Sequence, residues 1–285
     1  MNQNYHYPNI SQSVWILVLF SVLIGVLSIP FALLADDDSS QLSQHPAVGA
    51  LISVVAFGLI LMRGLKRAKA SLREICPLVP VRLSLLFPMA LAVIGTSILI
   101  SETDNLLRTF LPPPAWFDEL FRSLLSGEIS LWGSILSLVV VAPLTEELLV
   151  RGLILRGFLS HYSTRKAILA SAIFFGVLHL NPWQLIGATA LGILFAWWFV
   201  ETRSMLPCFF GHALANALPL TVMALIPLEI PGYTSGFEKG TFQPLWLDCV
   251  GVLLVVLGIW LLVHQFRKSG DTVSEDVSGD RSDQL

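Results

Sequence analysis

Residues 142–151 read Ala-Pro-Leu-Thr-Glu-Glu-Leu-Leu-Val-Arg and close a long apolar run that begins near Ile129. The stretch places two adjacent carboxylates, Glu146 and Glu147, and the guanidinium of Arg151 where the neighbouring sequence has almost no charge. Charged groups inside a membrane-spanning helix are costly, so they are expected to be used. The alternative is a charge cluster that marks the point where the helix reaches water.

The composition of the chain is that of an integral membrane protein. Its 285 residues are 54% hydrophobic and 13% charged, with a mean hydropathy of +0.73, whereas soluble domains carry about 25% charged residues. The net charge of −3 gives no indication of a nucleic-acid partner. The three cysteines are far apart and form no Cys-x-x-Cys motif, so neither a disulfide framework nor a cysteine metal site is predicted.

The apolar runs predict an all-α fold, a polytopic membrane helix bundle. About 20 apolar residues cross a bilayer as a helix, and a lone helix satisfies its own backbone polar groups in lipid. The first run is too long for a signal peptide and lacks a basic flank, so it is expected to stay in the protein. Eight spans are predicted, at approximately 14–35, 47–62, 83–100, 129–150, 166–181, 183–200, 204–226 and 244–266.

The loop charges predict the orientation of the bundle. Of the 17 basic residues, all but Arg108, Arg122 and Lys239 fall on one side of the predicted membrane. The opposite side also carries the acidic run Asp36–Asp38. The positive-inside rule therefore places both termini in the cytoplasm.

Two segments outside the spans have distinct compositions. The bundle is predicted to occupy residues 1–268, and the tail 269–285 is rich in Ser, Asp and Gly, which predicts a disordered cytoplasmic segment. Apolar residues at helical spacing over 117–125 predict an amphipathic helix on the outer membrane interface. A lid over a cavity is the alternative for this helix.

The spacing of the charged residues gives the two glutamates different environments. Adjacent residues of a helix point about 100° apart, so Glu146 and Glu147 do not face the same way. Glu147 and Arg151 are spaced i, i+4 and are expected to pair on one face. This leaves Glu146 as the unpaired carboxylate. Pro143, just upstream, removes a backbone hydrogen bond and predicts a kink.

Two later spans also carry polar residues in apolar sequence. His179 follows Phe175 by four residues in the fifth span, and His212 and Asn216 share one face of the seventh. Gly211 and a nearby alanine flank that face. Both residues are small enough for another helix to approach closely. Taken singly, each residue has a simpler explanation as a polar contact between neighbouring helices.

Together, these polar groups are expected to meet, because buried polar groups need partners. A carboxylate, two imidazoles and an amide suit the activation of water and the stabilisation of an oxyanion. Alternatively, Glu146, His179 and His212 match the ligand types of a hydrolytic zinc site. Their depths in the membrane agree best if the fourth helix continues to about Ser160, with the site in the cytoplasmic half.

Three motifs in order resemble the CPBP family of intramembrane proteases, also called the CAAX prenyl protease and bacteriocin-processing, or Abi, family. They are Glu-Glu-x-x-x-Arg at 146–151, Phe-x-x-x-His at 175–179 and His-x-x-x-Asn at 212–216. The resemblance covers about residues 129–226, the family's core.

The resemblance implies a membrane-embedded endopeptidase and a role for each motif residue. It implies that Glu146 and His179 activate and position the attacking water and that His212 and Asn216 stabilise the oxyanion. Glu147 and Arg151 would support the site from behind. Both a zinc mechanism and a metal-free glutamate mechanism are compatible with the resemblance. The implied partner is a peptide or membrane-protein substrate.

Two other functions fit parts of the sequence. A catalytically inactive relative would act as a membrane scaffold or as an immunity protein against a secreted peptide. A transporter would use the polar cluster as a proton relay, but transporters usually carry inverted repeats, and spans one to three do not mirror the later ones. Since the chain lacks a transit peptide or an endoplasmic reticulum signal, we expect it to lie in a bacterial inner membrane. A prenylated substrate is not expected there.

Overall fold

The computed structural model describes residues 6–33, 46–115, 117–119, 131–225, 229–235 and 240–282. Within these ranges the regular elements are helices, and the strand-like feature is one isolated bridge between Pro231 and Ser235. The predicted all-α fold is confirmed. Asp36–Asp38, Arg122, Lys239 and most of the predicted interfacial helix at 117–125 lie outside the described residues.

Eight helical segments follow one another along the described chain, and each overlaps one predicted span. The fourth, 131–161, is built in direct succession from α7 (Leu131–Ser134), η2 (Ile135–Val141), α8 (Ala142–Glu147), η3 (Leu148–Leu155) and α9 (Arg156–His161). The other seven are α1 (Ile10–Leu33), α3 (Pro46–Ala68), α5 (Leu86–Phe110), α10 (Thr164–Leu178), α11 (Pro182–Thr202), α12 (Leu206–Leu225) and α13 (Leu245–Ser282). Two short elements, α4 (Leu72–Ile75) and η1 (Leu83–Leu85), connect α3 to α5.

Five segments are long and apolar enough to cross a membrane by themselves: Ile10–Phe31, Val48–Ala68, Leu83–Phe110, Pro182–Thr202 and Leu245–Lys268. The apolar part of α12 is shorter, Leu206–Val222, and α10 has only 15 residues. Helices α3 and α5 continue past the predicted span ends at 62 and 100. Helix α3 carries Lys66 and Arg67 in its last turn, and α5 includes the ion pair between Asp104 and Arg108, so charged residues extend both helices past their apolar runs.

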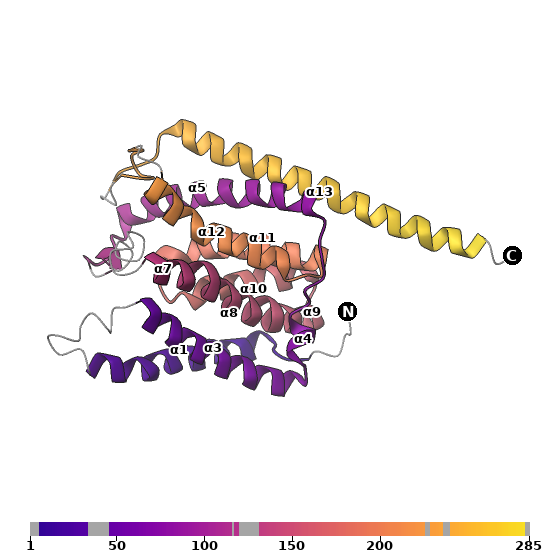
Figure 1. Ribbon diagram of the computed structural model, residues 1–285, viewed down its shortest axis with the longest axis horizontal. Coiled ribbons are helices and arrows are strands. Elements are labelled where there is room, and N and C mark those ends of the chain that lie inside the picture. The colour runs from indigo at the N-terminus through magenta and orange to yellow at the C-terminus, as the bar shows by residue number, and fades with distance from the viewer. Residues whose placement is uncertain are drawn as a thin grey trace.

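The helices run side by side, with α1 and α3 on one side of the bundle and α5 and α13 on the other (Figure 1). The 131–161 segment and helices α10, α11 and α12 lie between these two pairs, so the fourth span is at the centre of the molecule. The buried core includes Leu149, Val150 and Ile154 of this segment together with Phe195 and Trp198 of α11.

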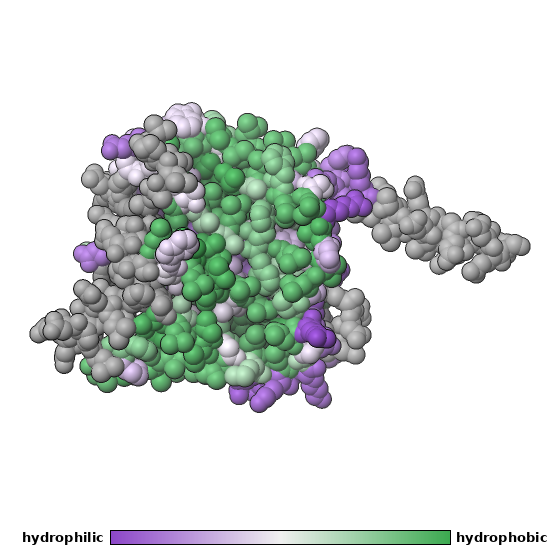
Figure 2. All heavy atoms as spheres, viewed as in Figure 1, coloured by the Kyte–Doolittle hydropathy of each residue, from purple (hydrophilic) through white to green (hydrophobic). Residues whose placement is uncertain are grey.

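The surface of the bundle is apolar along its length. Green side chains cover most of the visible described surface, and hydrophilic ones gather toward the end where α13 leaves the bundle (Figure 2). Large side chains such as Trp15, Trp132 and Trp260 are more than half exposed. Exposed apolar area on this scale is expected where lipid is the solvent. The protein is therefore a multi-pass membrane protein.

Helix α13 projects beyond the bundle at the end where α1 begins (Figure 1). It includes residues 269–282, where the sequence predicts a disordered tail. The tail is helical in the structure because it continues α13 without a break. Its polar composition offers no apolar face for packing, so disorder of this tail in solution stays a prediction.

Candidate functional site

The two glutamates lie on a short α-helical turn between two wider turns. Both glutamates belong to α8 (Ala142–Glu147). Helices α7 and η2 lead into α8, and η3 and α9 follow it. Both η2 and η3 are π-helical, a form that is frequent at functional sites. The prediction that the fourth helix continues to about Ser160 is confirmed.

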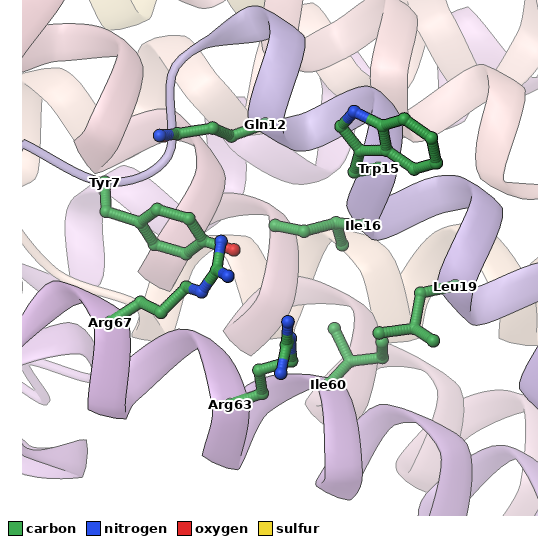
Figure 3. Close-up of a pocket in the computed structure, with 8 residues that line it drawn as sticks. All are labelled: Tyr7, Gln12, Trp15, Ile16, Leu19, Ile60, Arg63 and Arg67. Carbon is green, nitrogen blue, oxygen red and sulfur yellow. The ribbon is translucent and has the colours of Figure 1, made fainter.

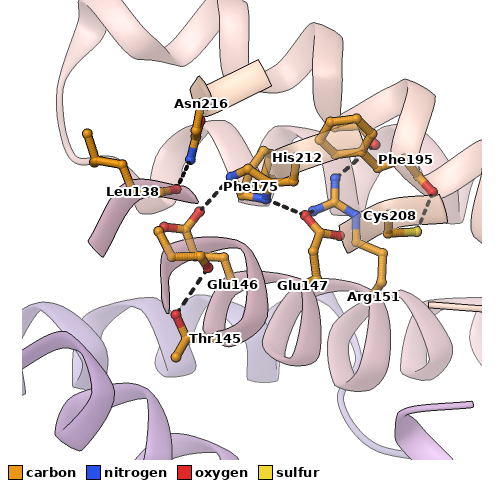
Figure 4. Close-up of polar contacts among 12 residues, drawn as sticks. Leu138, Thr145, Glu146, Glu147, Arg151, Phe175, Phe195, Cys208, His212 and Asn216 are labelled. Atoms are coloured by element: carbon orange, nitrogen blue, oxygen red, sulfur yellow. Dashed lines mark hydrogen bonds and ion pairs between the residues drawn. The ribbon is translucent and has the colours of Figure 1, made fainter. Parts of the chain in front are cut away.

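Pro143 frees a backbone carbonyl beside the glutamates. The Ala142 amide donates to the carbonyl of Ser137, five residues back, and Pro143 has no N–H to donate. The Leu138 carbonyl therefore receives no backbone hydrogen bond from either residue. Nδ2 of Asn216, on α12, donates to it instead at 2.8 Å (Figure 4). The irregularity expected at Pro143 thus ties α12 to the helix of the glutamates.

Glu147, Arg151 and His212 form a buried charged cluster. The Arg151 guanidinium donates to Oε1 of Glu147 at 2.9 Å, and Nδ1 of His212 lies 2.7 Å from the same oxygen. Glu147 and Arg151 are 0% exposed, and His212 is 4% exposed. The predicted pair of Glu147 and Arg151 is confirmed. The link from Glu147 to His212 was not predicted, and it joins the first and third motifs.

The Arg151 guanidinium is held by three further contacts. It donates to the Gly192 carbonyl of α11 at 3.1 Å. Its central carbon lies 4.4 Å from the centre of the Phe175 ring and 5.4 Å from that of Phe195. These rings add cation–π attraction to the ion pair. A buried charge with these partners is fixed in position, so Arg151 holds Glu147 in place.

His212 is held by its packing as well as by Glu147. Its ring stacks on Phe195 with centroids 5.8 Å apart. A Cβ at the preceding Gly211 would lie 2.6 Å from the Trp198 ring and 2.8 Å from the Phe195 ring. The predicted close approach at Gly211 is therefore confirmed. Because a carboxylate only accepts hydrogen bonds, Nδ1 of His212 donates to Glu147, and Nε2 faces the other way.

Glu146 is the carboxylate of the pair that makes no hydrogen bond within the described residues. Its Oε2 lies 3.8 Å from Nε2 of His212 (Figure 4), and its side chain is 19% exposed. This buried oxygen has no hydrogen-bond partner among the residues that the structure describes. Unsatisfied buried polar atoms are rare in folded proteins. Glu147 also has one buried oxygen without a partner, Oε2, but its Oε1 receives hydrogen bonds from Arg151 and His212. Glu146 receives none within the described residues and, as predicted, is left available for another group.

His179 lies beside this cluster and does not bond to it directly. Its Nδ1 is 3.0 Å from the Phe175 carbonyl, which only accepts, so Nδ1 carries the hydrogen and Nε2 is left as an acceptor. The Phe175 ring lies edge-on to both imidazoles, with centroids 5.3 Å from His179 and 5.4 Å from His212. Phe175 therefore contacts both histidines.

The described residues contain no group of three or more His, Cys, Asp and Glu side chains that could hold a metal ion. Glu146, His179 and His212 therefore do not fit the three-ligand zinc site that their residue types suggested.

Sequence reasoning missed the groups that hold the site from outside the motifs. These are the Leu138 and Gly192 carbonyls and the Phe195 ring. The signal for Leu138 was present, because Pro143 removes a donor from the turn before it. The other two depend on how α11 packs, which local spacing does not encode.

A family model matches the part of the chain that carries the site. The family model described as type II CAAX prenyl endopeptidase Rce1-like matches residues 128–218. Searches of curated proteins and of solved structures give no match. The matched range contains every residue of the cluster, from Glu146 to Asn216.

Proposed function

We propose that the protein hydrolyses a peptide bond in a membrane-associated or lipidated protein or peptide. Residues 128–218 belong to the type II CAAX prenyl endopeptidase Rce1-like family, which is a family of CAAX-type intramembrane proteases. The proposal rests on the arrangement of Glu146. An unpartnered carboxylate oxygen faces Nε2 of His212 at 3.8 Å, beside a fully buried ion pair that fixes that imidazole.

The proposed reaction begins with a water molecule bound at Glu146. The Glu146 carboxylate takes one proton from this water while the oxygen adds to the scissile carbonyl carbon. The carbonyl oxygen becomes an oxyanion. The proton then passes from Glu146 to the amide nitrogen, the C–N bond breaks, and a carboxylic acid and an amine leave the site.

His179, His212 and Asn216 are proposed to act on the water and the oxyanion. Nε2 of His179 is an acceptor, so it is suited to orient the attacking water. In its imidazolium form His212 donates from Nδ1 to Glu147 and from Nε2 toward the oxyanion. Asn216 uses one Nδ2 hydrogen on the Leu138 carbonyl and has a second to donate. Such donors are effective when they are already oriented.

Glu147 and Arg151 are proposed as positioning residues. Both are fully buried and so do not touch substrate. Glu147 orients the His212 ring through Nδ1, and Arg151 keeps Glu147 in place through the ion pair at 2.9 Å. A rigid shell of this kind keeps the reacting groups in position.

We further propose that the protein resides in a bacterial inner membrane with both termini in the cytoplasm. The basic loops support this orientation, and both ends of the described bundle lie on one side (Figure 1). The substrate would enter from the cytoplasmic half of the membrane. The positions of the motif residues along their predicted spans favour a site at that depth.

Metal removal distinguishes the two mechanisms that the family resemblance allows. Since the described residues do not form a three-ligand site, we expect cleavage to persist after exhaustive chelation, with no stoichiometric zinc in the purified protein by elemental analysis. Loss of cleavage on chelation that added zinc restores would contradict the glutamate mechanism.

The proposed function is tested by comparing membrane peptides from cells that carry the wild type and the Glu146→Gln variant. We expect uncleaved substrate to accumulate in the variant at unchanged protein level and membrane insertion. Identical peptide profiles, with the biological activity retained by the variant, would instead support a scaffold or immunity protein.

A further inference from the structure

A cavity of about 390 Å³ lies between α1 and α3, outside the catalytic cluster. Its lining consists of Tyr7, Gln12, Trp15, Ile16, Leu19, Ile60, Arg63 and Arg67 (Figure 3). Two of these side chains are guanidiniums, and none is a carboxylate. We propose that this cavity binds one anionic glycerophospholipid, with the phosphate at the arginines and an acyl chain along the apolar residues.

The polar end of the cavity offers hydrogen-bond donors. Arg63 and Arg67 are one turn apart on α3 and both extend into the cavity (Figure 3), and neither pairs with a carboxylate within the described ranges. Oε1 of Gln12 accepts from the Asn9 amide at 2.9 Å, which leaves its Nε2 to donate. Guanidiniums bind phosphate with paired hydrogen bonds.

The other end of the cavity is apolar and lies deeper in the predicted membrane. Ile16, Leu19 and Ile60 line it, toward the middle of α1 and α3, which are both candidate spans. Arg67 is in the last turn of α3, at the membrane end that sequence places in the cytoplasm. A charged site at the headgroup level above an apolar groove matches a phospholipid better than a soluble anion.

The cavity opens toward lipid. Trp15, at its edge, is 70% exposed, and Val14 and Val18 beside it on α1 are also exposed. Tryptophan is enriched at the interface between membrane and water. An anionic peptide would approach from water, so the lateral opening favours a lipid as the occupant.

The cavity walls are held in place before a ligand binds. A Cβ at Gly157 of α9 would clash with Pro8, and the Ile10 amide donates to the Tyr162 hydroxyl at 3.3 Å. The Arg67 guanidinium lies 5.7 Å from the centre of the Tyr7 ring. Gly64, between the two cavity arginines, packs against Leu153 of the segment that carries Glu146. The bound lipid would therefore sit on the pair of helices that supports the catalytic segment.

Native mass spectrometry of the full chain in detergent, with phosphatidylglycerol or phosphatidylcholine added, tests the proposal. We expect selective retention of phosphatidylglycerol and about 30-fold weaker binding in the Arg63→Gln/Arg67→Gln variant, equivalent to about 2 kcal/mol for two basic residues. The matched control is Arg73→Gln/Arg82→Gln, which removes two exposed arginines outside the cavity and should bind like the wild type.

Two further measurements separate the sources of the phosphate. The Leu19→Trp variant keeps the arginines and fills the apolar end, so it should also bind phosphatidylglycerol more weakly. Glycerol phosphate without acyl chains should not compete at equal concentration. The lipid assignment would be overturned if both double-arginine variants lost phosphatidylglycerol binding equally, or if glycerol phosphate competed fully. It would also be overturned if an acidic peptide bound more tightly than phosphatidylglycerol.

Discussion

At the scale of single residues, the neighbouring glutamates have opposite environments. Glu147 is fully buried and contacts Arg151 and His212 through Oε1, whereas Glu146 is partly exposed and receives no hydrogen bond within the described residues. A buried ion pair supports a structure only while both partners are present. The same substitution should therefore affect stability at one position and chemistry at the other.

Glu147→Gln is expected to destabilise the protein by roughly 3 kcal/mol, because it leaves the buried Arg151 charge without its carboxylate. Glu146→Gln should leave the unfolding midpoint unchanged or raised, since that carboxylate makes no hydrogen bond within the described residues and only approaches Nε2 of His212 at 3.8 Å. The measurement is thermal unfolding of both variants in one detergent.

A double-mutant cycle checks the cause of the Glu147 effect. The Glu147→Gln/Arg151→Met variant removes both charges, so its loss of stability should be smaller than the sum of the two single losses by more than about 0.5 kcal/mol. Additive losses would mean that the ion pair does not account for the effect.

At the scale of elements, the central segment departs from a regular helix where Pro143 removes a donor. The Leu138 carbonyl then depends on the Asn216 amide. Asn216→Leu should cost about 1–3 kcal/mol, because it leaves this carbonyl unsatisfied.

The cost should fall in a Pro143→Ala background, where residue 143 regains an N–H that can take the place of the amide. Chemical unfolding of the four proteins in the cycle measures both values. An equal cost of Asn216→Leu in the two backgrounds would show that the missing N–H is not the reason for the contact.

Sequence patterns predicted the elements better than their contacts. The apolar runs identified every helical segment of the described bundle, and helical spacing predicted the Glu147–Arg151 pair. Helices α3 and α5 extend beyond the predicted spans, because charged residues continue both helices past the apolar run. The contact of His212 with Glu147 depends on how α12 packs against the central segment. That packing involves residues far apart in the sequence, so local patterns do not specify it.

At the scale of the whole molecule, the bundle has an even number of helical segments in its described part, and its two ends lie on the same side (Figure 1). The basic loops predict that this side is cytoplasmic. Alkaline phosphatase, which is active only outside the cytoplasm, should therefore be inactive when fused at either terminus and active when inserted in the loop after α5. Activity at one terminus alone would contradict the bundle's topology.

The central claim is that Glu146 activates the water that cleaves a membrane peptide. The most direct measurement is the hydrolysis rate of a substrate peptide by purified protein in lipid nanodiscs, for the wild type, Glu146→Gln and the control Glu201→Gln. Glu201 is an exposed carboxylate at the end of α11. We predict that Glu146→Gln slows hydrolysis by about 10²–10⁴-fold, the usual contribution of a general base, and that Glu201→Gln hydrolyses the peptide at the wild-type rate. Equal rates for the two variants, with both folded, would contradict the account.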